Sequence, residues 1–201
     1  MFYRFGRFIC WLIFKIFFLL EVSGRENIPR NGAVMLVANH ASFLDPPLVG
    51  VASRRGLVFF AHQGLFNISF LGKLLWSVNV KPINRQRLEF SILAKISRLV
   101  KTNKAFVFFP EGKRSKTGEL QSGKPGVGLI AWKTRVKVVP AFIQGTYQAW
   151  PAKVKFFHPA KIKIIFGKPL ELSNFYKEGP SKELFQKIAD KMMRSINELG
   201  I

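Results

Sequence analysis

The chain has 201 residues, of which 48% are hydrophobic, and this suits one folded domain with a substantial core and excludes a disordered chain. Its 32 Lys and Arg residues against 11 Asp and Glu residues give a net charge of +21, which favours phosphate-bearing partners such as nucleic acid, anionic lipid or a phosphorylated substrate. The single cysteine, Cys10, excludes a disulfide framework within the chain, and the sequence has no zinc-ligand spacing.

The first twenty residues are almost all apolar and predict a helix that lies in a membrane interface. On a helical projection Arg4, Arg7 and Lys15 fall within an arc of roughly 80°, with Trp11 between them. The apolar run over residues 8–20 is short for the ~20 residues of a membrane-spanning helix. A buried core helix and a spanning helix with a snorkelling Lys15 stay open as alternatives.

The rest of the chain alternates between apolar strands and helices, the pattern of an α/β fold. Continuous apolar runs predict strands that are covered on both faces, at residues 33–38, 56–61, 105–110 and 136–145. Partial alternation predicts two edge strands, at residues 152–157 and 160–167.

Helices are expected between these strands and at the end of the chain, at residues 47–53, 67–78, 87–104, 124–134 and 181–200. We therefore expect a central, mostly parallel or mixed sheet flanked by helices. The predicted organisation is an N-terminal membrane-anchoring helix over residues 1–22 and a single α/β domain over residues 23–201.

The strand predicted at residues 33–38 ends in the letters NHAS, in which the histidine is His40, and Asp45 follows five positions later. Open α/β sheets place their binding sites at the carboxyl ends of strands. A neutral imidazole there can remove a proton from a hydroxyl when a carboxylate holds its other nitrogen. The spacing is compatible with a catalytic pair in which Asp45 orients His40.

Asp45 also has a structural interpretation. Ser42 followed three residues later by Asp45 resembles a capping box, in which both side chains bind free backbone N–H groups at a helix start. Pro46 suits the first turn of such a helix. No Gly-x-Ser-x-Gly nucleophile elbow occurs in the chain, so the nucleophile expected beside His40 is a hydroxyl of the substrate.

A second polar sequence, PEGKRS at residues 110–115, follows the next central strand. Gly112 permits close approach of the backbone to a ligand, and Arg114 offers a planar fork for a phosphate. Glu111 can orient the arginine or accept hydrogen bonds from a polyol. Alone, this motif is typical of a solvated turn, but two strands that both end in complementary polar residues favour a site.

The pair NHASFLD (39–45) and FPEGKRS (109–115) resembles the two hallmark motifs of the glycerolphosphate acyltransferase family. Within that family, the motifs are most similar to those of the bacterial enzymes that acylate 1-acyl-sn-glycerol-3-phosphate. The resemblance runs from about residue 23 to about residue 145.

Two weaker motifs fit the same family. PINR (82–85) ends in Arg85, and KVVPAF (137–142) contains Pro140. Lys113 stands where the family usually has threonine.

The resemblance implies an acyltransferase that moves a fatty acyl group to the sn-2 hydroxyl of 1-acyl-glycerol-3-phosphate and forms phosphatidic acid. His40 is then the general base, oriented by Asp45. The family implies no metal and no bound cofactor, and acyl-CoA or acyl-carrier protein (acyl-ACP) supplies the acyl group as a co-substrate. It also implies a set of substrate-binding residues: Arg85, Glu111, Gly112, Lys113 and Arg114 for the glycerol phosphate, and Pro140 to shape the pocket.

These implications predict an enzyme of phospholipid biosynthesis on the cytoplasmic face of the cell membrane, bound as a peripheral or monotopic protein. Its expected partners are lysophosphatidic acid, the acyl thioester and an anionic membrane surface, which attracts each nearby Lys or Arg by ~1 kcal/mol.

Two other functions stay open. The first is acylation of another lysolipid, because the motifs discriminate poorly between headgroups. The second is a non-catalytic basic protein that binds membrane or nucleic acid. Against nucleic acid, the sequence has no helix-turn-helix, zinc spacing or aromatic RNP pattern, so no nucleic-acid partner is expected.

Overall fold

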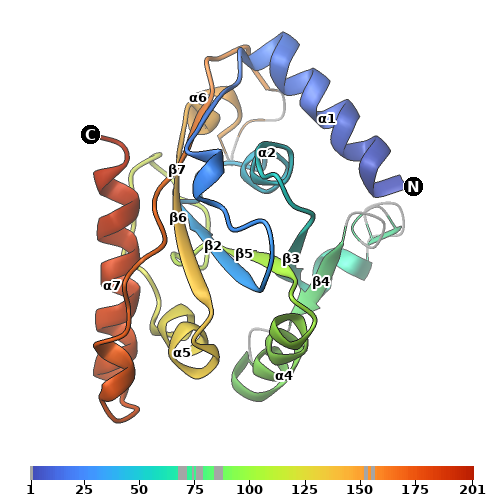
Figure 1. Ribbon diagram of the computed structural model, residues 1–201. Helices are drawn as coiled ribbons and strands as arrows, with labels where there is room; N and C mark the ends of the chain where they lie inside the picture. The colour runs from blue at the N-terminus through green and yellow to red at the C-terminus, as the bar shows by residue number, and fades with distance from the viewer. Residues whose placement is uncertain are drawn as a thin grey trace.

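The computed structural model describes residues 2–67, 72–73, 75, 79–83, 88–151, 154 and 157–201. These residues form three layers, with a seven-stranded sheet between two layers of helices (Figure 1). The predicted α/β fold is therefore confirmed. Most of the helix expected at residues 67–78 and of the strand expected at residues 152–157 lies outside the described residues.

The long apolar runs of the sequence form the inner strands of the sheet, as predicted. In chain order the strands are β1 (Glu21–Ser23), β2 (Val34–Ala38), β3 (Leu57–His62), β4 (Val80–Ile83), β5 (Ala105–Phe108), β6 (Lys137–Gln144) and β7 (Lys163–Phe166). Their spatial order is β1-β7-β6-β2-β5-β3-β4. Strands β2 to β6 run parallel, β7 pairs antiparallel with β6, and β1 runs parallel to β7.

Strand β7 corrects one prediction. The stretch 160–167 was expected at an edge of the sheet, but β7 lies between β1 and β6. Its alternation arises because Ile164 and Phe166 are buried in one core, whereas Lys163 and Ile165 are half-buried. Alternation of apolar and polar residues along a strand thus indicates that one of its faces is covered. It does not indicate whether the strand has neighbours on both of its edges.

Strand β2 brings the candidate site to the middle of the sheet. All five of its residues are buried, and it lies between β5 and β6. Val37 is in register with Phe108 of β5 and with Pro140 of β6. Because the three strands are parallel, the segments that follow them emerge at the same edge of the sheet.

Two layers of helices cover the sheet (Figure 1). One layer holds α1 (Phe2–Phe18), α2 (Asp45–Ala52) and α6 (Thr146–Ala149). The other holds α4 (Leu88–Lys101), α5 (Pro125–Thr134) and α7 (Lys182–Glu198). Short 3-10 helices occur at η1 (Arg25–Asn27), η2 (Gln63–Asn67) and η4 (Phe175–Lys177). Helix α7 begins as predicted, because the Ser181 side chain accepts a hydrogen bond from Leu184 N–H at 3.0 Å.

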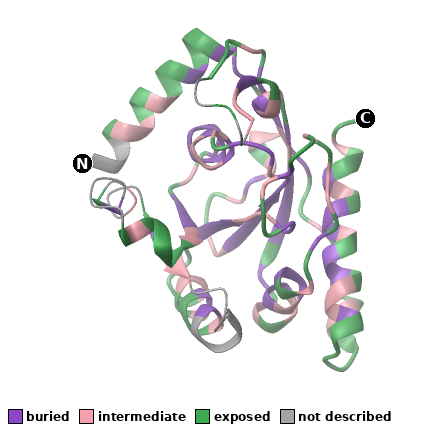
Figure 2. Cartoon of the chain, turned by 180° about the vertical axis from the view of Figure 1, so that it is seen from behind, coloured by how far each residue is buried: buried purple, intermediate pink, exposed green. Residues whose placement is uncertain are grey.

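Helix α1 confirms the predicted N-terminal helix and packs on α2 by one side only (Figure 1). Phe14 and Phe18 are buried in the core, whereas much of the remaining helix is exposed (Figure 2). Apart from Lys15, the exposed side chains of residues 5–18 are apolar: Phe5, Phe8, Ile9, Trp11, Leu12, Ile13, Ile16 and Phe17. In the part of the chain that the structure describes, no helix is long and apolar enough to cross a membrane.

Candidate active site

His40 and Asp45 form a hydrogen-bonded pair just beyond the carboxyl end of β2. The distance from His40 Nδ1 to Asp45 Oδ2 is 2.7 Å. The carboxylate is fully buried, and the imidazole is 16% exposed. Since Nδ1 faces the carboxylate, Nε2 is the nitrogen left to accept a proton from a substrate. The Phe109 ring stacks on the imidazole at 4.1 Å between centroids and limits its rotation.

Asp45 has the structural role as well. Its Oδ2 also accepts hydrogen bonds from the backbone N–H groups of Ala41 and Ser42, both at 2.7 Å. The Ser42 side chain does not complete a capping box, because its hydroxyl donates to the Trp150 carbonyl and accepts from Leu44 N–H. The turn thus holds the carboxylate rigidly, and one oxygen serves both the backbone and the histidine.

Glu111 joins the two polar motifs. Its Oε1 accepts a hydrogen bond from the His40 backbone N–H at 3.2 Å, and its Oε2 accepts one from Gln121 Nε2 at 3.2 Å. The side chain is only 1% exposed. Burial raises the pKa of the Glu111 carboxyl to about 7, and the charge of Asp45 adds to the rise, although the bonds from His40 and Gln121 oppose it. A second link between the motifs runs from Ser115 N–H to the His40 carbonyl, at 2.7 Å.

Arg114 lies beside the pair. Its guanidinium carbon lies 3.5 Å from the centroid of the Phe43 ring. The negative charge of Asp45 also interacts with the guanidinium. Burial lowers the pKa of the guanidinium. Among the described residues, Arg114 has a buried Nη1 without a hydrogen-bond acceptor, and Asp45 Oδ1 is likewise unpaired. An unpaired buried donor is costly, and an anionic ligand would satisfy it.

The other predicted site residues have different surroundings. Gly112, at φ +71°, makes the turn after β5, and a side chain there would be strained even though there is room for it. Lys113 is exposed. Pro140 is buried in β6 and lies against Gly167, so it faces the layer that holds α7 rather than the layer that holds α2. Arg85 lies outside the described residues.

The structure adds residues that the sequence did not single out. Asn39 ties β2 to β6 through two hydrogen bonds with the backbone of Ile143, at 2.9 and 2.7 Å. A row of aromatic rings leads from the site toward α1, with neighbouring centroids 5.7 to 6.3 Å apart: Phe43, Trp150, Phe157 and Phe17. No sequence pattern predicts this row of rings, because the four residues are far apart in the chain.

No group of three or more His, Cys, Asp or Glu residues that could hold a metal ion occurs in the described ranges. The fold is that of an α/β protein, and it places a histidine bonded to a buried carboxylate at the carboxyl end of a parallel strand, beside a half-buried arginine. Such an arrangement is chemically able to act as a general base beside an anionic group.

Comparison of the chain with known protein families identifies its family. The family model for Acyltransferase matches residues 19–144, which is more than half of the chain. The chain therefore belongs to the acyltransferase family, and the resemblance predicted from its two motifs is confirmed.

Individual relatives agree with this assignment. A 1-acyl-sn-glycerol-3-phosphate acyltransferase of Bacillus subtilis (strain 168) is 28% identical over 182 residues, covering 90% of this chain and 87% of the relative. The chloroplastic 1-acyl-sn-glycerol-3-phosphate acyltransferase of Arabidopsis thaliana is 31% identical over 175 residues, covering 83% of this chain and 49% of the relative. The chain spans about half the length of the plant relatives that it matches.

A solved structure has the same fold. The crystal structure of the 1-acyl-sn-glycerophosphate acyltransferase PlsC from Thermotoga maritima superimposes with a TM-score of 0.76 at 29% identity, covering 99% of this chain and 78% of that one.

Proposed function

We propose that the protein transfers a fatty acyl group from an acyl thioester to the sn-2 hydroxyl of 1-acyl-glycerol-3-phosphate, giving phosphatidic acid. The observation that carries this proposal is the 2.7 Å contact between His40 Nδ1 and Asp45 Oδ2, which leaves Nε2 for the acceptor hydroxyl. The names of the bacterial and plant relatives supply the acceptor, and acylation of its sn-2 hydroxyl gives phosphatidic acid.

The chemistry balances with these two residues and the two substrates. His40 Nε2 takes the hydroxyl proton as the acceptor oxygen attacks the thioester carbonyl. The C–S bond then breaks, and the leaving thiol recovers the proton from the imidazolium. Asp45 stabilises the imidazolium without accepting its proton. Base catalysis of this kind contributes roughly 10²–10⁴-fold, so positioning of the two substrates must supply much of the rest.

For the acceptor's phosphate we propose Arg114, because its buried Nη1 lacks an acceptor among the described residues. Arg85 and Lys113 remain proposed phosphate ligands from the family resemblance. Glu111 suits a different role, since both of its oxygens already hold protein donors and it has almost no exposed surface. We propose that it positions the His40 backbone rather than binding the phosphate itself.

The lipid substrate can approach from the membrane along α1. The exposed apolar side of this helix suits insertion into the bilayer surface, and the net charge of +21 suits anionic lipid. From α1 the row of Phe17, Phe157, Trp150 and Phe43 offers an apolar path toward Arg114. We therefore propose a peripheral protein of the cytoplasmic membrane face, with acyl-CoA or acyl-ACP as the donor.

The test is acyl transfer in detergent micelles by the wild type, His40→Ala and Asp45→Asn. Lysophosphatidic acid, lysophosphatidylcholine and lysophosphatidylethanolamine are offered with each thioester. The wild type is expected to form phosphatidic acid, and His40→Ala is expected to lose roughly 10²–10⁴-fold in rate because the base is gone.

Circular dichroism and urea denaturation of each variant provide the folding control. Transfer to another lysolipid in preference to lysophosphatidic acid would change the acceptor but keep the reaction. A folded His40→Ala variant with the wild-type rate would refute the role of His40. A folded wild type that is inactive on every acceptor would refute the acyltransferase proposal.

A further inference from the structure

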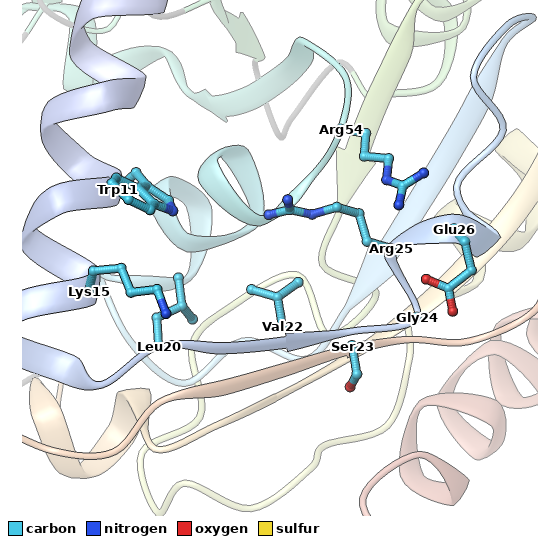
Figure 3. A pocket seen from close by; sticks show the side chains of 9 residues that line it. All are labelled: Trp11, Lys15, Leu20, Val22, Ser23, Gly24, Arg25, Glu26 and Arg54. Atoms are coloured by element: carbon cyan, nitrogen blue, oxygen red, sulfur yellow. The ribbon is translucent and has the colours of Figure 1, made fainter.

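A cavity of about 370 Å³ lies beside α1 (Figure 3). It is at the other end of α2 from the His40–Asp45 pair. Helix α1, the strand β1 with the residues on either side of it, the helix η1 and the turn after α2 all contribute to it. Its lining residues are Trp11, Lys15, Leu20, Val22, Ser23, Gly24, Arg25, Glu26 and Arg54. We refer to it as the α1 pocket.

The α1 pocket is strongly basic. Lys15, Arg25 and Arg54 line it, and Arg7 lies close enough for its charge to act on Arg25. Burial, together with repulsion from Arg7 and Arg54, lowers the pKa of the Arg25 guanidinium. The carboxylate in the lining, Glu26, is exposed, points away from the Arg25 guanidinium (Figure 3) and forms no ion pair within the described part of the chain.

Only part of the hydrogen-bonding capacity of these basic side chains is used to cap the end of α2. The Arg25 side chain donates to the Ala52 carbonyl at 2.6 Å, and Arg7 donates to the Ser53 carbonyl, so both arginines cap the end of α2. Each guanidinium carries five N–H donors, and these bonds use one from each. Lys15 and Arg54 are exposed and make no hydrogen bond or ion pair to any residue that the structure describes.

The α1 pocket also adjoins an apolar surface. Trp11 and Lys15 lie on the side of α1 between its buried residues and the exposed apolar side that includes Phe5, Leu12 and Ile16. Tryptophan and lysine in such a position are typical anchors at the boundary between lipid headgroups and acyl chains. A ligand that suits both surfaces has an anionic group joined to long apolar chains.

We propose that the α1 pocket binds the phosphate of an anionic phospholipid, whose acyl chains lie along the exposed apolar side of α1. This is a lipid site separate from the catalytic centre, because Asp45 is the first residue of α2 and Arg54 follows its last by two residues. Eight helical residues separate the two ends of α2 by about 12 Å. The inference rests on the proposed membrane association, but not on acyl transfer.

The test uses vesicle sedimentation of the full chain. One set of vesicles is pure phosphatidylcholine, and the other contains phosphatidylglycerol as well. The pocket variant is Lys15→Gln with Arg54→Gln. The matched control is Lys182→Gln with Arg194→Gln, which removes the same charge from exposed positions of α7 on the opposite layer. Urea denaturation confirms that both variants are folded.

We expect the pocket variant to lose at least about tenfold in affinity for the anionic vesicles and the control to lose less than about threefold. Glu26→Gln should bind them more tightly than the wild type, because it removes the carboxylate from the lining. Binding of the wild type to phosphatidylcholine alone reports on the apolar side of α1, so its absence would refute membrane association through that side and not the acyl transfer.

Equal losses in the pocket variant and the control would mean that only the overall charge matters, and would overturn the proposal. Inorganic phosphate offers a second arm, followed by tryptophan fluorescence without vesicles. A saturable change that disappears in the pocket variant would assign the pocket to a free phosphate and overturn the lipid assignment. No such change, together with the loss of vesicle binding, would support it.

Discussion

Asp45 has a structural task and a proposed chemical task, and both use a single oxygen atom. Two backbone N–H groups and the His40 ring all meet at its Oδ2. Substitutions that remove the acceptor and substitutions that remove only the charge should therefore separate the two tasks.

We predict that Asp45→Ala lowers the free energy of unfolding by about 2–4 kcal/mol, because two buried N–H groups lose their acceptor. Asp45→Asn keeps an oxygen in place and should lose less, although it lacks the charge that stabilises an imidazolium. His40→Ala leaves both backbone bonds intact and should cost about 1 kcal/mol. Urea denaturation measures all three, and equal losses for Asp45→Ala and Asp45→Asn would contradict the proposed division.

Glu111 makes stability depend on pH in the unusual direction for a carboxylic acid. Burial raises its pKa to about 7 in the folded protein, above the ordinary value of 4.5 for a glutamic acid side chain. The folded state therefore binds the proton more tightly than the unfolded state does. The stabilisation is fully present below about pH 4.5 and is lost as the pH rises through about 7.

We predict that the wild type loses stability relative to Glu111→Gln as the pH rises between these two values. The difference between the folded-state pKa of about 7 and the ordinary value of 4.5 corresponds to a loss in the free energy of unfolding on the order of 3 kcal/mol. Urea denaturation at a series of pH values measures the difference between the two proteins. If the two curves stay parallel over this range, Glu111 does not titrate as proposed.

At the scale of elements, α1 has two apolar sides with different surroundings, one buried and one exposed. Phe18 is 1% exposed and belongs to the core, whereas Phe5 is 64% exposed. The same substitution at these two positions therefore makes a matched pair.

We predict that Phe18→Ala lowers the free energy of unfolding by about 3–5 kcal/mol, because it leaves a cavity in the core. Phe5→Ala should change it by less than about 0.5 kcal/mol. Binding to phosphatidylcholine vesicles should show the reverse order, with a loss of about tenfold or more for Phe5→Ala, because a buried phenylalanine contributes about 1.5–3 kcal/mol. A Phe5→Ala variant with wild-type vesicle binding would remove this side of α1 from the membrane contact.

Several elements were predictable because their signal is local. Strands β2, β5 and β6 appear as continuous apolar runs because both of their faces are covered. The contact between His40 and Asp45 spans five positions, so the turn alone brings the two side chains together. The side of α1 that faces the core was not predictable, because both of its sides are apolar.

Other parts depend on contacts between distant residues. The bond from the His40 backbone to Glu111 joins positions 71 apart and exists only because β2 pairs with β5. Likewise, β1 has three residues and lies in the sheet only because β7 offers it a partner. Strand β4 is also short and contains Pro82, which an edge strand tolerates.

At the scale of the whole molecule, positive charge greatly exceeds negative charge, so most of it has no acidic residue to pair with. The sequence carries 32 Lys and Arg residues but 11 Asp and Glu residues, and in the described ranges Lys161 and Lys187 form ion pairs with carboxylates. An unpaired surface charge of this size attracts an anionic membrane over a distance set by the salt concentration.

We predict that binding to vesicles that contain phosphatidylglycerol weakens at least tenfold when the salt concentration rises from about 0.1 M to about 1 M, because the screening length falls from about 10 Å to about 3 Å. Binding to phosphatidylcholine alone should not weaken, since it depends on the apolar side of α1. The difference between the two vesicle types at each salt concentration measures the electrostatic contribution. Unchanged binding to the anionic vesicles at high salt would show that the charge of +21 serves another partner, such as an acidic carrier protein.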